Sequence, residues 1–317
     1  MKYRVFVDGQ EGTTGLKIHD YLSVRPDIEV LKIDPDKRKD KEARKALLNE
    51  ADIVFLCLPD TVARESVSLI TNEGTRIIDP STAHRVHPNW TYGLPELNKL
   101  QRERIRESKR VAVPGCHATG FILALYPLVQ EAIVPKDYPV VCHSTTGYTG
   151  GGRSMIAEYE NAISAVDKLR SPRHYALGLN HKHIPEMQKV TGLENPPIFT
   201  PVVSNYYKGM AVSIPLFPHL LNKKVAPADV VSVLSEYYDG EEFVRVIPAD
   251  IEDYLDNGFL NLEECNNTNR VDIFVFGNAD RILLLSRLDN LGKGASGAAV
   301  QNMNLMLGID ERTGLTS

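Results

Sequence analysis

The stretch "YRVFVDGQEGTTGLKIHDYLSV", residues 3–24, decides the fold. Its first six residues, which include the β-branched Val5 and Val7, predict a strand, and "LKIHDYLSV" has the apolar spacing of a helix. Gly9, Gly12 and Gly15 form a G-x-x-G-x-x-G turn between them. Such a turn lets a pyrophosphate approach the N–H groups of the helix N-terminus. Because the usual spacing is G-x-G-x-x-G, a purely structural turn stays open as an alternative to a dinucleotide site.

Strand and helix keep alternating up to residue 115. We expect strands at 28–34, 52–59, 75–81 and 110–115, with helices at 39–51, 63–71 and 96–108. The run "DIVFLCLP" is almost continuously apolar, which is typical of a parallel strand covered on both faces. The pattern predicts a doubly wound α/β sheet, the Rossmann arrangement of dinucleotide-binding domains.

Beyond residue 116 the pattern changes. A helix is expected at 120–132, and β-branched and aromatic runs follow between about 196 and 285, interrupted by a helix at 227–240. This pattern predicts an α+β domain with a mixed or antiparallel sheet and helices on one face. The small residues of 292–308 predict a last helix that docks against a flat surface.

Composition excludes several classes of protein. The 317 residues are 43% hydrophobic and 24% charged, as in ordinary soluble globular proteins, and the net charge of −5 gives no attraction to nucleic acid or anionic membranes. We find no apolar run of 18 residues, and Asp8 and Gly9 interrupt the start too early for a signal peptide. Four cysteines without a C-x-x-C pair favour a reducing cytoplasm.

Cys116 stands at a corner, in "VPGCHATG", between a strand and a helix. A helix N-terminus favours the thiolate and lowers the pKa of a thiol, so Cys116 is a candidate covalent nucleophile. The alternative is a helix-capping cysteine without chemistry. Cys57 and Cys142 lie inside apolar runs and are expected to pack, while acidic neighbours disfavour a thiolate at Cys265.

A proton partner is available in "LNHKHIPE", residues 179–186. A histidine oriented by Glu186 would serve as general acid and base. His181 and His183 could share a face and hold zinc, but no further ligands stand at suitable spacing, so no metal is expected. Two exposed loop histidines remain the plain alternative.

Basic residues suggest anion sites. Asp34 ends the second strand and could bind a ribose or be an ordinary strand-end residue, while the cluster beginning at Lys37 would suit the 2′-phosphate of NADP. Arg85, in "DPSTAHR", lies at the edge of the sheet where ligands bind, and could hold a carboxylate or phosphate. Arg153 follows the glycine-rich loop "TTGYTGGGR", and Lys208 is a further cation or an ordinary surface lysine.

Seven stretches in order resemble one family, the short form of the N-acetyl-γ-glutamyl-phosphate reductases of arginine biosynthesis. They are "DGQEGTTG", "DPSTAHR", "YGLPEL", "VPGCHATG", "TTGYTGGGR", "LNHKHIPE" and "LDNLGKGASGAAVQNMNLMLG". The resemblance spans residues 8–308. It implies a dinucleotide-binding domain of residues 1–115 and 290–317, and a catalytic, dimer-forming domain of residues 116–289 resembling that of glyceraldehyde-3-phosphate dehydrogenase.

The same resemblance implies the chemistry. Cys116 would be the nucleophile that forms a thioacyl enzyme, and His183, with Glu186, the acid and base. NADP would bind at the turn made of Gly9, Gly12, Thr13, Thr14 and Gly15, and Asn290 would lie by the nicotinamide. A small acyl phosphate would be reduced to a semialdehyde by a cytoplasmic homo-oligomer, a dimer or tetramer. The long form has Tyr-Pro-Thr after its cysteine where this chain has "HAT", so the long form's substrate contacts do not transfer to Arg85, Arg153 and Lys208.

Three rivals remain at this point. A related semialdehyde dehydrogenase acting on aspartyl phosphate or an aminoadipyl derivative would share the cysteine, the histidine and the cofactor. A dinucleotide-binding sensor would have no need of Cys116, His183 and Glu186 together. A zinc hydrolase would use His181 and His183.

Overall fold

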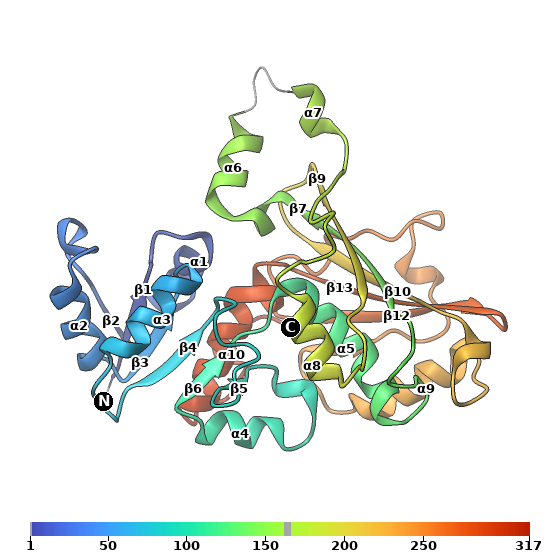
Figure 1. Cartoon of the computed structure of the whole chain (residues 1–317), viewed down its shortest axis with the longest axis horizontal. Coiled ribbons are helices and arrows are strands. Elements are labelled where there is room, and N and C mark those ends of the chain that lie inside the picture. Colours follow the sequence, from blue (N-terminus) through green and yellow to red (C-terminus); the bar gives the residue numbers. More distant parts are fainter. Residues whose placement is uncertain (1, 162–165) are drawn as a thin grey trace. The chain divides into compact units, whose positions relative to one another are not determined.

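The computed structural model describes residues 2–161 and 166–317, and the chain divides into two units (Figure 1). The first comprises the chain up to Gly115 together with Ala295–Leu315, and the second Cys116–Gly294 with Thr316–Ser317. The sequence predicts that the chain returns to the first unit at Asn290, but the return lies at Ala295. The reason is that the Asn290 side chain bonds to Gly209 and Thr149, both in the second unit.

The first unit is built on a six-stranded sheet of order β2-β1-β3-β4-β6-β5, with every described pair parallel. Its strands are β1 (Tyr3–Asp8), β2 (Ile28–Leu31), β3 (Ile53–Leu56), β4 (Arg76–Asp79), β5 (Thr91–Tyr92) and β6 (Arg110–Ala112). Its helices are α1 (Thr13–Ser23), α2 (Lys41–Glu50), α3 (Asp60–Leu69), α4 (Gln101–Glu107) and α10 (Gly297–Met306), with short 3-10 turns at Pro35–Lys37 and Pro95–Leu97.

Both faces of this sheet are covered, because successive side chains of a strand point to opposite faces. On β1, Val5 and Val7 pack in one core cluster with Ile18 of α1, and Phe6 packs in the other with Leu48 of α2. Helix α10 completes the face of α1, and all ten of its residues are buried. The alternation of strand and helix thus forms the doubly wound sheet that the sequence predicts.

The second unit has a seven-stranded mixed sheet of order β11-β12-β13-β10-β7-β9-β8. Its strands are β7 (Val141–Gly147), β8 (Arg173–His174), β9 (Ile198–Ser204), β10 (Met210–Leu216), β11 (Val244–Val246), β12 (Val271–Asn278) and β13 (Arg281–Leu288). Its helices are α5 (Cys116–Gln130), α6 (Gly152–Glu160), α7 (Val166–Arg170), α8 (Ile184–Thr191) and α9 (Pro227–Tyr237), with 3-10 turns at Tyr148–Gly151, Pro218–Leu220 and Glu252–Tyr254. A π-helical turn, Gly292–Ser296, precedes α10.

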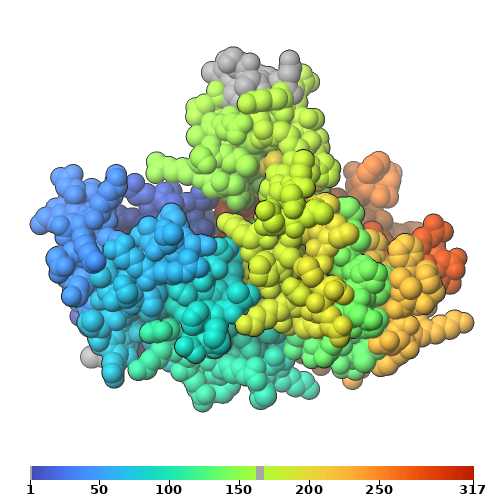
Figure 2. All heavy atoms as spheres, viewed as in Figure 1, coloured from blue at the N-terminus to red at the C-terminus, as the bar shows by residue number. Residues whose placement is uncertain are grey.

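Helix α5 is the central helix of this unit and is buried along nearly its whole length. Gly120 allows its close approach to the sheet, since a Cβ there would lie 2.5 Å from Ser286 Oγ. Helix α8 packs against α5 (Figure 1), and its atoms form part of the yellow surface in Figure 2. Within residues 2–161 and 166–317, no helix combines the length and the apolar character that crossing a membrane requires.

A buried charge network lies on β12. Asp272 is fully buried and accepts hydrogen bonds from Arg245, Arg270 and the equally buried Arg287. Cys265 also donates its S–H to Asp272, at 3.3 Å. Four donor groups thus satisfy one carboxylate, as a buried charge requires.

Candidate active site

The glycine turn of the first unit is too tight for side chains. Gly9 has φ of +91°, and a Cβ on it would lie 2.2 Å from the carbonyl oxygen of Cys57. A Cβ on Gly15 would lie 2.5 Å from the carbonyl oxygen of Gly9. A Cβ on Gly12 would lie 3.6 Å from the same oxygen, which is an ordinary van der Waals contact. Helix α1 begins at once, at Thr13. The turn therefore leaves backbone exposed at a helix N-terminus, as a pyrophosphate site requires.

Gly15→Ala is expected to weaken cofactor binding. The added Cβ must push the turn open and move backbone N–H groups away from the pyrophosphate. A hydrogen bond to a charged group contributes about 1.5–3 kcal/mol, or about 10- to 150-fold in Kd. Titration of NADPH fluorescence measures the change. Equal Kd values for Gly15→Ala and the unaltered protein would contradict the assignment.

A cavity of about 420 Å³ opens beside this turn. Gly9 and Gly12 line it together with three basic residues, Arg38, Lys39 and Arg44, the last of which is paired with Asp8. Arg38 forms an ion pair with Glu11, and both side chains are about half exposed. Lys37, expected from the sequence at a phosphate, instead belongs to the 3-10 turn Pro35–Lys37 and is not among the lining residues.

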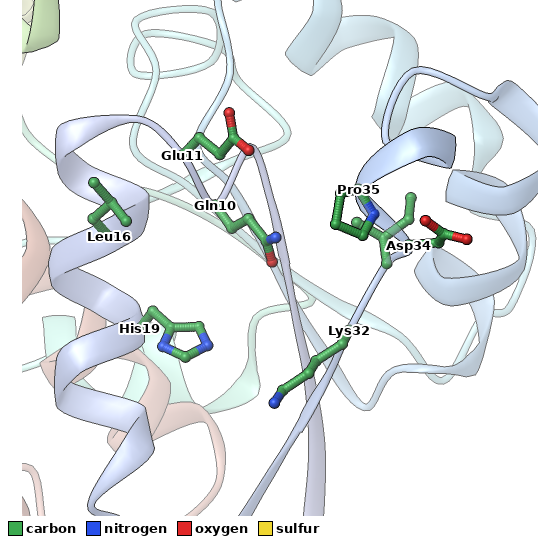
Figure 3. A pocket seen from close by; sticks show the side chains of 8 residues that line it. Gln10, Glu11, Leu16, His19, Lys32, Asp34 and Pro35 are labelled. Carbon is green, nitrogen blue, oxygen red and sulfur yellow. The ribbon is translucent and has the colours of Figure 1, made fainter.

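Asp34 has a local structural role. Its carboxylate accepts a hydrogen bond from the backbone N–H of Asp36 at 3.0 Å and caps the 3-10 turn. It lines an adjoining hollow of about 600 Å³, where its carboxylate points away from His19 and Lys32 (Figure 3). Of the two roles that the sequence left open, the ordinary strand-end residue fits this geometry.

Cys116 is the first residue of α5, as the sequence predicts, and is partly exposed. Gly294 makes room for it, since a Cβ on Gly294 would lie 2.7 Å from the Cβ of Cys116. The other cysteines are poor nucleophiles. Burial raises the pKa of Cys57 and of Cys142 far above the usual value, and burial together with the charge of Asp272 raises the pKa of Cys265 to about 11.

Next to the cysteine, His117 occupies a hydrogen-bonded chain that the sequence did not reveal. Its Nδ1 lies 2.7 Å from Ser144 Oγ and its Nε2 lies 2.9 Å from the hydroxyl of Tyr175. Burial, together with the charges of His181 and Lys182, lowers the pKa of His117 to about 3. The imidazole is therefore neutral at pH 7 and takes no part as a general acid.

His183 joins the same cluster. It is the N-cap residue of α8 and is buried, and its donor atom lies within 4.8 Å of those of Cys116 and His117. His181 stands beside it, with ring centroids 4.6 Å apart, but His181 Nδ1 accepts the backbone N–H of His183 at 3.1 Å. Glu186 follows in the first turn of α8 and is also buried. Of the two histidines, His183 is thus the one grouped with the cysteine.

Three further residues that the sequence predicts for the site, Asn290, Lys208 and Arg153, also lie in the second unit. Asn290 donates to Thr149 Oγ1 at 2.9 Å and accepts the backbone N–H of Gly209 at 2.8 Å, so it ties the glycine-rich loop to β10. Lys208 forms an ion pair with Asp289 at 3.4 Å. Arg153 is exposed near the start of α6.

Arg85 belongs to the first unit and braces its backbone. Its guanidinium donates to the carbonyl oxygens of Val113 and Pro80, each at 2.9 Å. Nearby, His84 bonds to Asp79 at 2.6 Å and stacks on Trp90. These contacts favour a structural role for Arg85, in holding the corner that leads to the cysteine.

Comparison with known proteins places this geometry in a family. Residues 4–108 match the semialdehyde dehydrogenase NAD-binding domain, and residues 116–290 match the semialdehyde dehydrogenase dimerisation domain. The chain is 44% identical over 320 residues to N-acetyl-gamma-glutamyl-phosphate reductase 2 of Nostoc sp., with 99% of each chain covered. It is 47% identical over 311 residues to the N-acetyl-gamma-glutamyl-phosphate reductase of Brucella ovis, with 97% of this chain and 100% of the other covered. The chain belongs to the N-acetyl-γ-glutamyl-phosphate reductases of the semialdehyde dehydrogenase family.

Solved structures extend the likeness of this family member to the fold. An aspartate semialdehyde dehydrogenase II of Vibrio cholerae superimposes with a TM-score of 0.73 at 16% identity, with 97% of this chain and 99% of the other covered. An aspartate semialdehyde dehydrogenase with NADP from Candida albicans gives 0.63 at 16% identity, with the same coverage. The predicted fold class, a Rossmann domain with an α+β domain, is confirmed, and so is the resemblance of the sequence to this reductase family.

Proposed function

We infer that the chain reduces N-acetyl-L-glutamyl 5-phosphate to N-acetyl-L-glutamate 5-semialdehyde and phosphate, with NADPH, in arginine biosynthesis. The observation that carries this inference is the end-to-end match to reductases of that name, combined with a partly exposed cysteine at a helix N-terminus beside a buried histidine. The sensor hypothesis is wrong, because the chain is a member of a reductase family.

Cys116 opens the reaction. Its thiolate attacks the acyl carbon of the phosphate anhydride, the C–S bond forms, and the C–O bond to phosphate breaks with the electron pair leaving on phosphate, which takes up a proton from solvent. The helix N-terminus stabilises the thiolate before attack. An acyl phosphate is already activated, so the protein supplies mainly position and charge stabilisation.

The residues of the first unit fit a dinucleotide. Gly9, Gly12 and Gly15 leave the cradle that a pyrophosphate fills, and Arg38 and Lys39 supply positive charge in the cavity beside it. When bound, the nicotinamide cofactor supplies the hydride that reduces the thioester carbonyl.

His183 completes the proton balance. It holds the proton that neutralises the developing oxyanion, and receives a proton when the C–S bond breaks and the semialdehyde leaves. Its buried position and the buried Glu186 one turn away support this assignment. Lys208 and Arg153 are the cations of the same unit proposed to meet the substrate's charges.

The reverse reaction tests the function. N-acetyl-glutamate semialdehyde, NADP and phosphate are supplied, and NADPH is followed by absorbance. Turnover is expected only with phosphate present. Turnover without phosphate would mean that water resolves the thioester, and a preference for aspartate semialdehyde would give the chain a different substrate.

Arg38→Ala is expected to weaken binding of NADPH by about 10- to 150-fold and leave binding of NADH unchanged. A hydrogen bond to a charged group contributes about 1.5–3 kcal/mol, and only NADPH carries the 2′-phosphate. Isothermal titration calorimetry with NADPH and with NADH measures the two Kd values. Lys37→Ala is the control, and a larger effect there than at Arg38 would restore Lys37 as the phosphate ligand.

The second unit carries the family's dimerisation domain. We propose that the protein is a cytoplasmic homo-oligomer. Light scattering after size exclusion is expected to give about two or four times the chain mass of 35.3 kDa. A species at the mass of a single chain would contradict this.

A further inference from the structure

Three metal-binding side chains converge at the start of α5. The donor atoms of Cys116, His117 and His183 all lie within 4.8 Å of one another, and both histidines are buried. Thiolate and imidazole are the ligands that Zn²⁺ prefers, and three of them with one open position make an accessible site. Carboxylate-preferring ions such as Mg²⁺ and Ca²⁺ have no match in this set.

The hydrogen bonds around His117 prepare it as a ligand. Ser144 Oγ donates its single proton to the carbonyl oxygen of Ala211 at 3.0 Å, so its oxygen can only accept from His117 Nδ1–H. The proton of His117 is therefore on Nδ1, and Nε2 carries a lone pair, to which Tyr175 donates. An acceptor that holds the N–H of the far nitrogen is the usual support of a metal-bound histidine.

Tyr175 already occupies this lone pair, since its hydroxyl lies 2.9 Å from Nε2. A cation bound at Nε2 would take the place of the Tyr175 proton.

We propose that Cys116, His117 and His183 form an inhibitory Zn²⁺ site that withdraws the cysteine from catalysis. On binding, the Cys116 thiol releases its proton to solvent and an S–Zn bond forms. His117 Nε2 and a His183 nitrogen donate lone pairs, the Tyr175 hydroxyl loses its acceptor, and water fills the fourth position. No atom is oxidised or reduced, so a chelator reverses the inhibition. His181 lies outside the set, although its ring adjoins that of His183.

The test uses the full-length protein with Zn²⁺, and with Co²⁺ as a spectroscopic substitute. We expect one Zn²⁺ per chain, a thiolate-to-Co²⁺ charge-transfer band that Cys116→Ser abolishes, and protection of Cys116 from iodoacetamide by Zn²⁺. Ser144→Ala, which removes the support of His117 and no ligand, is expected to weaken Zn²⁺ by about 10- to 100-fold. His143→Gln, at an exposed histidine next to Ser144 on β7, is the matched control and should leave Zn²⁺ affinity unchanged.

Several results would overturn the site. They are Co²⁺ bound without the thiolate band, alkylation of Cys116 unaffected by Zn²⁺, or Zn²⁺ binding weakened as much by His143→Gln as by Ser144→Ala. The rate of Cys116 alkylation in the unaltered protein, with and without Zn²⁺, tests the site even if a variant fails to fold. None of these readouts uses turnover, so they stand apart from the proposed reductase activity.

Discussion

Cys116→Ser is expected to fold normally and to lose reductase turnover by at least about 10⁴-fold, the scale on which nucleophile deletions act. Serine keeps the size and the helix position, but its hydroxyl does not ionise near neutral pH and cannot attack at a comparable rate. Single-turnover assays with the acyl phosphate would show no thioester, and mass spectrometry of the quenched enzyme would show no acyl adduct.

Cys142→Ala is the matched control. Cys142 is fully buried in β7 and its raised pKa keeps it a thiol, so this variant should retain turnover. Near-native turnover in Cys116→Ser would remove Cys116 as the nucleophile, whatever the control does.

Asp272→Asn is expected to destabilise the second unit by about 3–5 kcal/mol, the usual result of removing one partner of a buried ion pair. The substitution keeps the shape of the side chain but leaves Arg287, which has no exposed surface, without its buried counter-charge. Denaturant unfolding of the full chain at pH 7 measures the loss. Asp310→Asn, at an exposed pair with Arg312, is the control and should show no measurable change.

This penalty depends on pH with a definite sign. Burial alone would raise the pKa of Asp272, but hydrogen bonds from Arg245 and Arg287 more than offset it and hold the pKa below the ordinary 3.8. Folding therefore gains from the carboxylate fully above pH 3.8, and loses that gain as pH falls through the lower folded pKa. The difference between Asp272→Asn and the unaltered protein should shrink in that acid range. A difference that stayed constant there would show that shape, not charge, sets the cost.

The fold was predictable because its signals are local. A strand, a glycine turn and a helix follow one another within residues 3–24. Each strand or helix shows its own hydrophobic periodicity within about ten residues. The sequence predicts the return to the first unit at Asn290, before its observed position at Ala295. Asn290 stays in the second unit through its contacts with Gly209 and Thr149, which lie far away in the sequence and leave no local signal. The two-residue strand β5 has too few residues to show any period.

The site was predictable in part for the same reason. Cys116 is marked by the corner just before it, and the pair of His183 and Glu186 by their spacing. The sequence gives no signal for His117, because its hydrogen-bond partners Ser144 and Tyr175 lie 27 and 58 residues further along the chain. Arg38, rather than Lys37, lines the cavity because the capped 3-10 turn decides which basic side chain faces it.

Helix α10 has a consequence for how the protein is made. It fills part of one face of the first unit's sheet with ten buried residues, yet it follows the whole of the second unit in the chain. The sheet must therefore wait, with Val5, Ile53 and Val111 only partly covered on the face that α1 and α10 share, until the whole of the second unit has been synthesised. During synthesis the second unit can fold first, and the nascent first unit is the stretch most in need of a chaperone.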